Sequence, residues 1–184
     1  MTVHKLLVDG SVRELYKATG GAWGGNKVNE AFIEYLCEMF SKEVIEKITQ
    51  EYPDDWVDIM NEFEKIKRKI SLNDQDDFVY LKLRPCIQEV YQKVMNINLD
   101  KAVKDNLAGT KGAIFNDRTI QIPKSVLSEM IRQVAKKISS HTEFLLKENE
   151  NLDFVVMVGG FSNSPIVVEV VKDCVPLFYS SNCS

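Results

Sequence analysis

The amino-acid sequence predicts an α/β fold, and three observations lead to this class. Short apolar strands alternate with amphipathic helical stretches along the chain. A long helical pattern, from about Ser125 to Lys147, leads directly into the apolar run Phe154 to Val158, which is typical of a buried strand. The pair Gly159-Gly160 then indicates a turn at the carboxyl end of that strand. In folds of this class, ligands bind where strands end and helices begin.

The first 29 residues predict a β-hairpin followed by a glycine-rich loop. Apolar runs flank Asp9-Gly10-Ser11, and an Asp-Gly pair between such runs favours a hairpin turn. The stretch TGGAWGGNKVN, residues 19–29, then places four glycines in six positions. This density indicates a backbone that needs positive φ or that comes close to another group.

Three helices are expected between residues 28 and 70. Apolar residues recur there at three- and four-residue spacing, Ser41 is a candidate cap for a short second helix, and Pro53 interrupts the pattern. Asp54 or Asp55 is then expected to cap the third helix. This third helix has the clearest apolar stripe, formed by Trp56, Ile59, Met60, Phe63, Ile66 and Ile70.

The second half of the chain predicts further strands and helices in alternation. FVYLKL predicts a strand, and Cys86 to Met95 predicts a helix. GAIFNDRTIQIP predicts a hairpin with Asn116-Asp117 at its turn, and the last helix is expected from about Ser164 to Asp173. The long helix before the apolar strand is expected to bury Val126, Met130, Ile131, Val134, Ile138 and Phe144.

Length and composition indicate one soluble globular domain, or a core with a sizeable insertion. The 184 residues are 45% apolar and 27% charged, and no apolar stretch is long enough to span a bilayer. The amino-terminal segment lacks the apolar core of a signal peptide, so we expect a cytoplasmic protein. A net charge of -4 provides no general attraction to nucleic acid.

The cysteines and histidines predict neither a metal site nor a catalytic nucleophile. His4 and His141 lie near neither each other nor a cysteine, and no zinc-ligand spacing occurs. For Cys37 and Cys86, a role as small buried residues in helices is favoured over a redox role. The four cysteines are Cys37, Cys86, Cys174 and Cys183.

The first candidate site is a row of polar residues on the third expected helix. Glu64, Lys67, Arg68 and Ser71 are spaced i, i+3, i+4 and i+7, so one helix face would present all four. A carboxylate can bind ribose hydroxyls, an arginine plane can stack on adenine, and a serine can bond a ring nitrogen. From spacing alone, a solvated face with a Glu-Lys or Glu-Arg pair is the favoured alternative.

The second candidate site is the glycine pair Gly159-Gly160. A strand that ends in two glycines exposes backbone N-H groups without Cβ atoms, so a phosphate or ribose could lie against it. Neither glycine pair of the chain completes G-x-G-x-x-G, and no G-x-x-x-x-G-K-[ST] occurs. A tight strand-to-helix turn with no ligand remains the alternative.

Three motifs in order resemble one known family. VHKLLVDGSVRELYKATGGAWGG, FEKIKRKIS and LDFVVMVGGFSNSP are similar to the second lobe of the actin-like ATPase domain of the seventy-kilodalton heat-shock proteins, and most similar to the divergent member-12 branch. This resemblance implies a ribonuclease-H-like lobe, with a mixed sheet packed with helices and an inserted α+β subdomain. The core would comprise about residues 1–24 and 120–184, and the insertion about residues 25–119.

The resemblance also implies an adenine nucleotide, ATP or ADP, held between the two subdomains. Helix residues would grip ribose and adenine, and the two glycine pairs would lie against the nucleotide. Asn163 stands where typical members carry the arginine that covers adenine, and Asn26 stands where they carry an acidic residue. The nucleotide-binding residues implied are Gly24, Gly25, Glu64, Lys67, Arg68, Ser71, Gly159, Gly160 and Asn163.

Hydrolysis by this chain alone is not expected. The family's catalytic Asp-x-Gly-Thr-Thr and Asp-x-Gly-Gly-Gly-Thr loops do not occur in the sequence, and Mg²⁺ is expected only if the first lobe were present. The first lobe and the peptide-binding domain are both expected to be absent. The alternative is a non-catalytic interaction module, a truncated paralogue that no longer binds nucleotide and contacts other proteins through its exposed lobe-lobe face.

Overall fold

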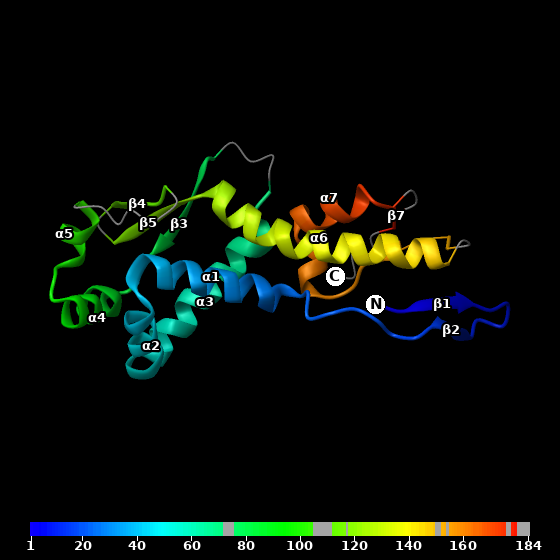
Figure 1. The fold of residues 1–184 in the computed structure, drawn as a ribbon, viewed down its shortest axis with the longest axis horizontal. Helices are drawn as coiled ribbons and strands as arrows, with labels where there is room; N and C mark the ends of the chain where they lie inside the picture. The colour runs from blue at the N-terminus through cyan, green and yellow to red at the C-terminus, as the bar shows by residue number, and fades with distance from the viewer. Residues whose placement is uncertain are drawn as a thin grey trace.

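A computed structural model describes residues 1–71, 76–104, 112–116, 118–149, 152–153, 155–175 and 178–179 (Figure 1). The first part contains strands β1 (Val3–Leu6) and β2 (Val12–Tyr16) and helices α1 (Gly25–Phe40), α2 (Lys42–Glu51) and α3 (Pro53–Lys69). The middle contains β3 (Phe78–Lys82), α4 (Pro85–Met95), α5 (Leu99–Lys104), β4 (Ile114–Asn116) and β5 (Thr119–Pro123). The last part contains α6 (Lys124–Glu148), β6 (Val155–Val156), the 3₁₀ turn η1 (Gly160–Asn163), α7 (Pro165–Lys172) and β7 (Phe178–Tyr179).

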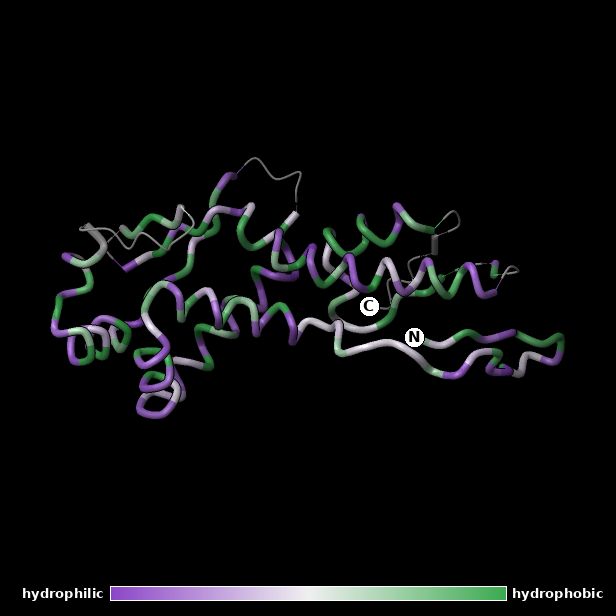
Figure 2. Tube along the Cα trace, viewed as in Figure 1, coloured by the Kyte–Doolittle hydropathy of each residue, from purple (hydrophilic) through white to green (hydrophobic). Residues whose placement is uncertain are grey.

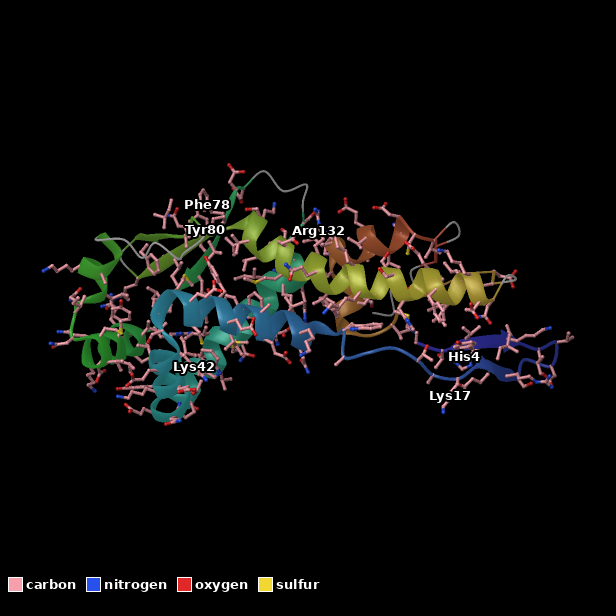
Figure 3. All side chains as sticks on the ribbon, viewed as in Figure 1. His4, Lys17, Lys42, Phe78, Tyr80 and Arg132 are labelled. Carbon is pink, nitrogen blue, oxygen red and sulfur yellow. The ribbon has the colours of Figure 1, made fainter. Side chains whose placement is uncertain are left out.

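The molecule is elongated, and α6 runs along its length. Figure 1 shows the β1–β2 hairpin at one end and α2, α4 and the sheet of β3, β4 and β5 at the other. Figure 3 shows the same separation, with His4 and Lys17 at the hairpin end and Phe78 and Tyr80 on β3. One continuous cluster of buried apolar side chains extends from α1, α2 and α3 through β5 to α6 and α7.

The α/β class is confirmed, and the described strands form three small sheets. The predicted hairpins β1–β2 and β4–β5 are both antiparallel, and β3 extends the second of them in the order β3-β5-β4. Asp117, expected at the turn of the second hairpin, lies outside the described residues. The third sheet pairs β6 with β7 in parallel. The single mixed sheet that the resemblance implies is not seen within the described part of the chain.

The helix boundaries confirm one predicted cap and correct another. The Ser41 side chain accepts a hydrogen bond from the Val44 amide, 3.3 Å away, and so caps α2 as expected. The predicted cap of α3 by Asp54 or Asp55 is wrong, because α3 already begins at Pro53. Proline suits the first position of a helix because its fixed φ is helical. It also loses no hydrogen bond there, since an N-H at this position would have no acceptor within the helix.

The long helix and the apolar strand differ in part from the expectation. Most of the predicted side of α6 is buried or half-buried, but Phe144 is 45% exposed and the buried face includes Ser128 and Thr142. The predicted strand from Phe154 to Val158 is shorter, because only Val155 and Val156 are in β6 and Phe154 lies outside the described residues. Its predicted burial is also wrong, since Val156 is 49% and Val158 80% exposed.

Hydropathy follows this architecture. Figure 2 shows hydrophobic and hydrophilic residues alternating around the helices, as expected where one face of each helix packs on the core. Among the described helices, none has the length and apolar content needed to cross a membrane.

Candidate functional site

An aromatic stack joins α1 and α3 where the two helices cross. The Phe32 and Phe63 rings are nearly parallel, at 5°, with centroids 3.8 Å apart, and both side chains are buried. Phe63 lies four residues before Lys67, and Phe32 lies seven residues after Gly25. The stack therefore brings the first turn of α1, which begins at Gly25, close to Lys67 in the last turn of α3.

Lys67 joins these two helix ends through hydrogen bonds. Although it is a lysine, its side chain is only 5% exposed. Its Nζ donates to the Gly25 carbonyl oxygen at 3.2 Å, to Asn29 Oδ1 at 2.8 Å and to Glu64 Oε1. The Asn29 amide also donates to Glu64 Oε1, at 2.8 Å. A buried ammonium needs several such partners, so Lys67 connects the first glycine loop to α3.

Glu64 remains ionised because of this network. Partial burial alone would raise the pKa of the Glu64 carboxyl. Hydrogen bonds from Lys67 and Asn29, together with the positive charges of Lys67 and Arg68, outweigh that effect and lower the pKa below its usual value. Arg68 is only a loose partner, because its Nε lies 3.8 Å from Glu64 Oε2 and its side chain is 64% exposed. Its guanidinium is therefore largely available to a ligand.

A cavity of about 280 Å³ opens at the point where the two glycine segments meet α3. Five of the nine predicted site residues line it: Gly25, Glu64, Lys67, Arg68 and Gly160. The structure does not bring Gly24, Ser71, Gly159 or Asn163, all of them described, to the wall of this cavity. Ser71 was expected on the same helix face, but α3 ends at Lys69 and the i+7 spacing does not apply.

Sequence reasoning missed further residues at this site. Asn26, Phe161 and Ser164 also line the cavity, and Asn29 completes the Lys67 network. Asn29 could have been found from its position one helical turn after Gly25, on the side of α1 that faces α3. Ser164 had no comparable signal, because its burial depends on how α7 packs.

The two residues of the second glycine pair have different roles. Gly159 has φ 95° and ψ 161°, a backbone conformation that residues with a Cβ almost never adopt. A Cβ on Gly160 would meet no atom of the described residues within 4 Å, so none of them requires glycine there. Gly159 therefore forms the turn, while Gly160 leaves open space at the cavity wall.

A second, larger cavity of about 660 Å³ lies beside the first and shares Gly25, Asn26 and Phe161 with it. Its wall includes the glycine-rich loop, with Gly24, and apolar side chains from α6, α7 and the segment after β6.

The glycine-rich loop is anchored on α6 through His141. The Thr19 hydroxyl and the His141 Nε2 are 2.9 Å apart, and the Trp23 ring packs edge-on against the His141 ring at 5.2 Å. A Cβ on Gly21 would approach the Trp23 ring to 2.6 Å, so this packing requires glycine at position 21.

The described residues provide no group of three or more His, Cys, Asp or Glu side chains that could hold a metal ion. The predicted burial is confirmed for Cys86, whereas Cys37 is half-buried. Burial and the adjacent Asp55 raise the pKa of the Cys86 thiol to about 12, which disfavours a reactive thiolate.

Comparisons with known proteins confirm the predicted resemblance. Heat shock 70 kDa protein 12A of Mus musculus is 28% identical over 176 residues, which is 94% of this chain and 26% of that protein. The Homo sapiens protein of the same name is 27% identical over 176 residues, and human heat shock 70 kDa protein 12B is 27% identical over 182 residues. The chain thus spans about a quarter of the length of the curated relatives it matches. No family model and no solved structure matches it.

Proposed function

We propose that this chain is part of a nucleotide-binding domain of the heat shock 70 kDa protein 12A and 12B type, and that it binds an adenine nucleotide, ATP or ADP, at the 280 Å³ cavity. One observation carries the proposal: three segments far apart in the sequence, around Gly25, Glu64 and Gly160, line a single cavity. These are the segments that the resemblance to the family implicates in nucleotide binding.

The proposal includes a division of the chain into two subdomains of a ribonuclease-H-like lobe. Residues of about 1–24 and 120–184 form the core, and residues of about 25–119 form the insertion. The position of the cavity supports this division, because α1 and α3 supply one wall and the segment from Gly160 to Ser164 supplies the other. A ligand held there contacts both subdomains.

The chemistry of the wall suits a base and a ribose. Arg68 offers an exposed guanidinium plane that can stack on an aromatic base. The Glu64 carboxylate is ionised and accepts hydrogen bonds from sugar hydroxyls. Gly160 allows the ligand to approach the backbone. Lys67 takes a supporting role, because its ammonium already has three protein partners.

We propose binding without hydrolysis for this chain alone. Phosphoryl transfer needs a positioned water, metal ions and charge stabilisation around the transferred group. Among the described residues that line the two cavities there is no Asp and, apart from Glu64, no Glu to hold Mg²⁺. Hydrolysis therefore requires groups beyond those of the two cavities described.

Isothermal titration with ADP tests the proposal, using wild type, Arg68→Ala and the control Lys69→Ala. Both variants remove one exposed cation from α3, but Lys69 does not line the cavity. Loss of the stacked guanidinium should weaken binding by roughly 2- to 30-fold, since such contacts contribute about 0.5–2 kcal/mol. Lys69→Ala should bind as wild type does. Equal affinity in all three proteins would remove Arg68 from the site, and no binding by wild type would refute the proposal.

The exposed apolar side chains of the hairpin favour a second candidate, the non-catalytic interaction module. Leu6 is 69%, Val12 63% and Leu15 52% exposed on β1 and β2. Leu6 and Val12 pair across the hairpin and so lie on one face, where they form a small exposed apolar surface that a partner protein could cover. Under this alternative, ADP produces no thermal shift, and the partner proteins that the immobilised chain retains without nucleotide are lost in Leu6→Lys.

A further inference from the structure

Ser164 carries a buried hydroxyl without a partner. The residue is 1% exposed, and its Oγ has no hydrogen-bond partner among the described residues. Ser162, two positions earlier in the same segment, donates its hydroxyl to the Gly159 carbonyl oxygen at 2.6 Å. The same short turn therefore contains one hydrogen-bonded hydroxyl, on Ser162, and one unpaired hydroxyl, on Ser164.

The position of Ser164 makes the unused hydroxyl more unusual. Ser164 is the N-cap residue of α7, where a serine side chain normally accepts a hydrogen bond from the first turn of the helix. Its side chain makes no such bond. A buried polar group without a partner destabilises the fold, so native structures rarely retain one without a reason. Its backbone groups are paired, since the amide bonds Phe161 and the carbonyl bonds Val168.

Ser164 lines the 280 Å³ cavity together with Glu64 and Arg68. We infer that the Ser164 hydroxyl is a ligand-binding group: a rotation of its side chain brings the buried Oγ to the cavity, where it bonds a ring nitrogen or the amino group on the polar edge of a bound purine base. This inference rests on the proposed nucleotide site. It assigns to Ser164 the discrimination between a purine and a pyrimidine base.

The other groups around the cavity favour the base over the phosphates as the partner of Ser164. The Glu64 carboxylate would repel a phosphate, and the Lys67 ammonium that could offset it is bonded to Glu64, Asn29 and Gly25. Besides the Asn26 side chain, the remaining wall offers the Phe161 ring and the Arg68 guanidinium, two flat groups that suit a planar ligand. A neutral planar group with hydrogen-bonding atoms at its edge is what a purine provides.

The inference predicts opposite effects of Ser164→Ala on stability and on binding. Removing an unpaired buried hydroxyl should raise the thermal midpoint of the ligand-free protein. The same change should weaken ADP binding about two- to tenfold, because one hydrogen bond to the ligand is lost. The preference for ADP over CDP should fall by a similar factor, since a pyrimidine places its polar edge elsewhere.

Two matched serine variants serve as controls. Ser162→Ala removes the paired hydroxyl of the same turn, so it should lower the thermal midpoint and leave the ratio of ADP to CDP affinity unchanged. Ser128→Ala removes another buried, unpaired hydroxyl, on α6 and outside the cavity. It should raise the thermal midpoint without any effect on ADP binding.

The experiment separates failure of the inference from failure of the proposed function. If wild type and Ser164→Ala bind ADP equally, or if the ratio of ADP to CDP affinity is the same in both, the inference is overturned while the nucleotide site stands. A lower thermal midpoint for ligand-free Ser164→Ala would also overturn it, because the hydroxyl would then be structural. Absence of ADP binding by wild type overturns the proposed function itself.

Discussion

Lys67 and Arg68 are neighbours in the sequence but lie in opposite environments. Lys67 is buried against α1 with three hydrogen-bond partners, whereas Arg68 is 64% exposed at the cavity. Spacing along α3 could identify both as polar residues near one face. It could not distinguish them, because the burial of Lys67 depends on Gly25 and Asn29, about 40 residues away in the sequence.

The Glu64 network gives the stability of the protein a specific dependence on pH. Because the folded state holds the pKa of Glu64 below its usual value of 4.5, ionised Glu64 stabilises the fold above that pH. The contribution is lost as the pH falls through the lower, folded-state pKa. Glu64→Gln should therefore lower the free energy of unfolding by about 1–3 kcal/mol at pH 7, and by progressively less as the pH falls below 4.5. Urea unfolding of both proteins across this range measures the difference.

Glu62→Gln is the matched control for this measurement. Glu62 lies on α3 but takes no part in the Lys67 hydrogen bonds. Its substitution should change stability by less than about 0.5 kcal/mol at pH 7. A Glu64→Gln effect that is independent of pH would show that the carboxylate charge does not stabilise the fold.

At the scale of elements, the pairing of α1 with α3 determines whether the cavity exists. The sequence predicted both helices and the apolar stripe of α3, because helical periodicity is a local signal. It did not predict the end of α3 before Ser71 or the 3₁₀ turn from Gly160 to Asn163. Both features depend on contacts with segments that are distant in the sequence, and local residue patterns do not predict such contacts.

The Phe32–Phe63 stack is the contact to test at this scale. Phe63→Ala should lower the free energy of unfolding by about 3–5 kcal/mol, because it removes a fully buried ring. Phe63→Leu should lower the free energy of unfolding by less than about 2 kcal/mol. It should also weaken ADP binding, although Phe63 does not line the cavity, because the hydrogen bond from Lys67 to the Gly25 carbonyl oxygen depends on how the two helices pack. Urea unfolding and titration measure the two effects. A Phe63→Ala cost below about 1 kcal/mol would show that the stack does not hold the helices together.

For the molecule as a whole, stability should be uneven along the long axis. Val3 is the only buried residue of β1 and β2, whereas Ile120 and Ile122 of β5 are almost completely buried. Backbone hydrogen bonds without an apolar cover open more often. Amide hydrogens of the hairpin should therefore exchange with solvent much faster than those of β5, as measured by mass spectrometry. Equal protection of both segments would contradict this description.

The distribution of sheets was the least predictable property of the whole molecule. Turn chemistry at Asp9-Gly10 and around Asn116 is local, and both hairpins were predicted. Whether the resulting pairs join into one sheet depends on contacts between distant segments, and the described strands remain in three groups. The burial expected for Val156 and Val158 was wrong for the same reason, since it assumed neighbours on both faces.

The adjacent glycines at positions 159 and 160 are constrained differently by the fold. Folding alone excludes other residues at position 159, because φ is 95° there. Among the described residues, none would meet a side chain at position 160, so a ligand in the cavity is the constraint that would exclude alanine or serine there. In a population of variants selected for folding alone, position 159 should stay glycine while position 160 drifts. If substitutions are excluded at both positions, the restriction at position 160 would indicate ligand binding, even when the ligand is not identified.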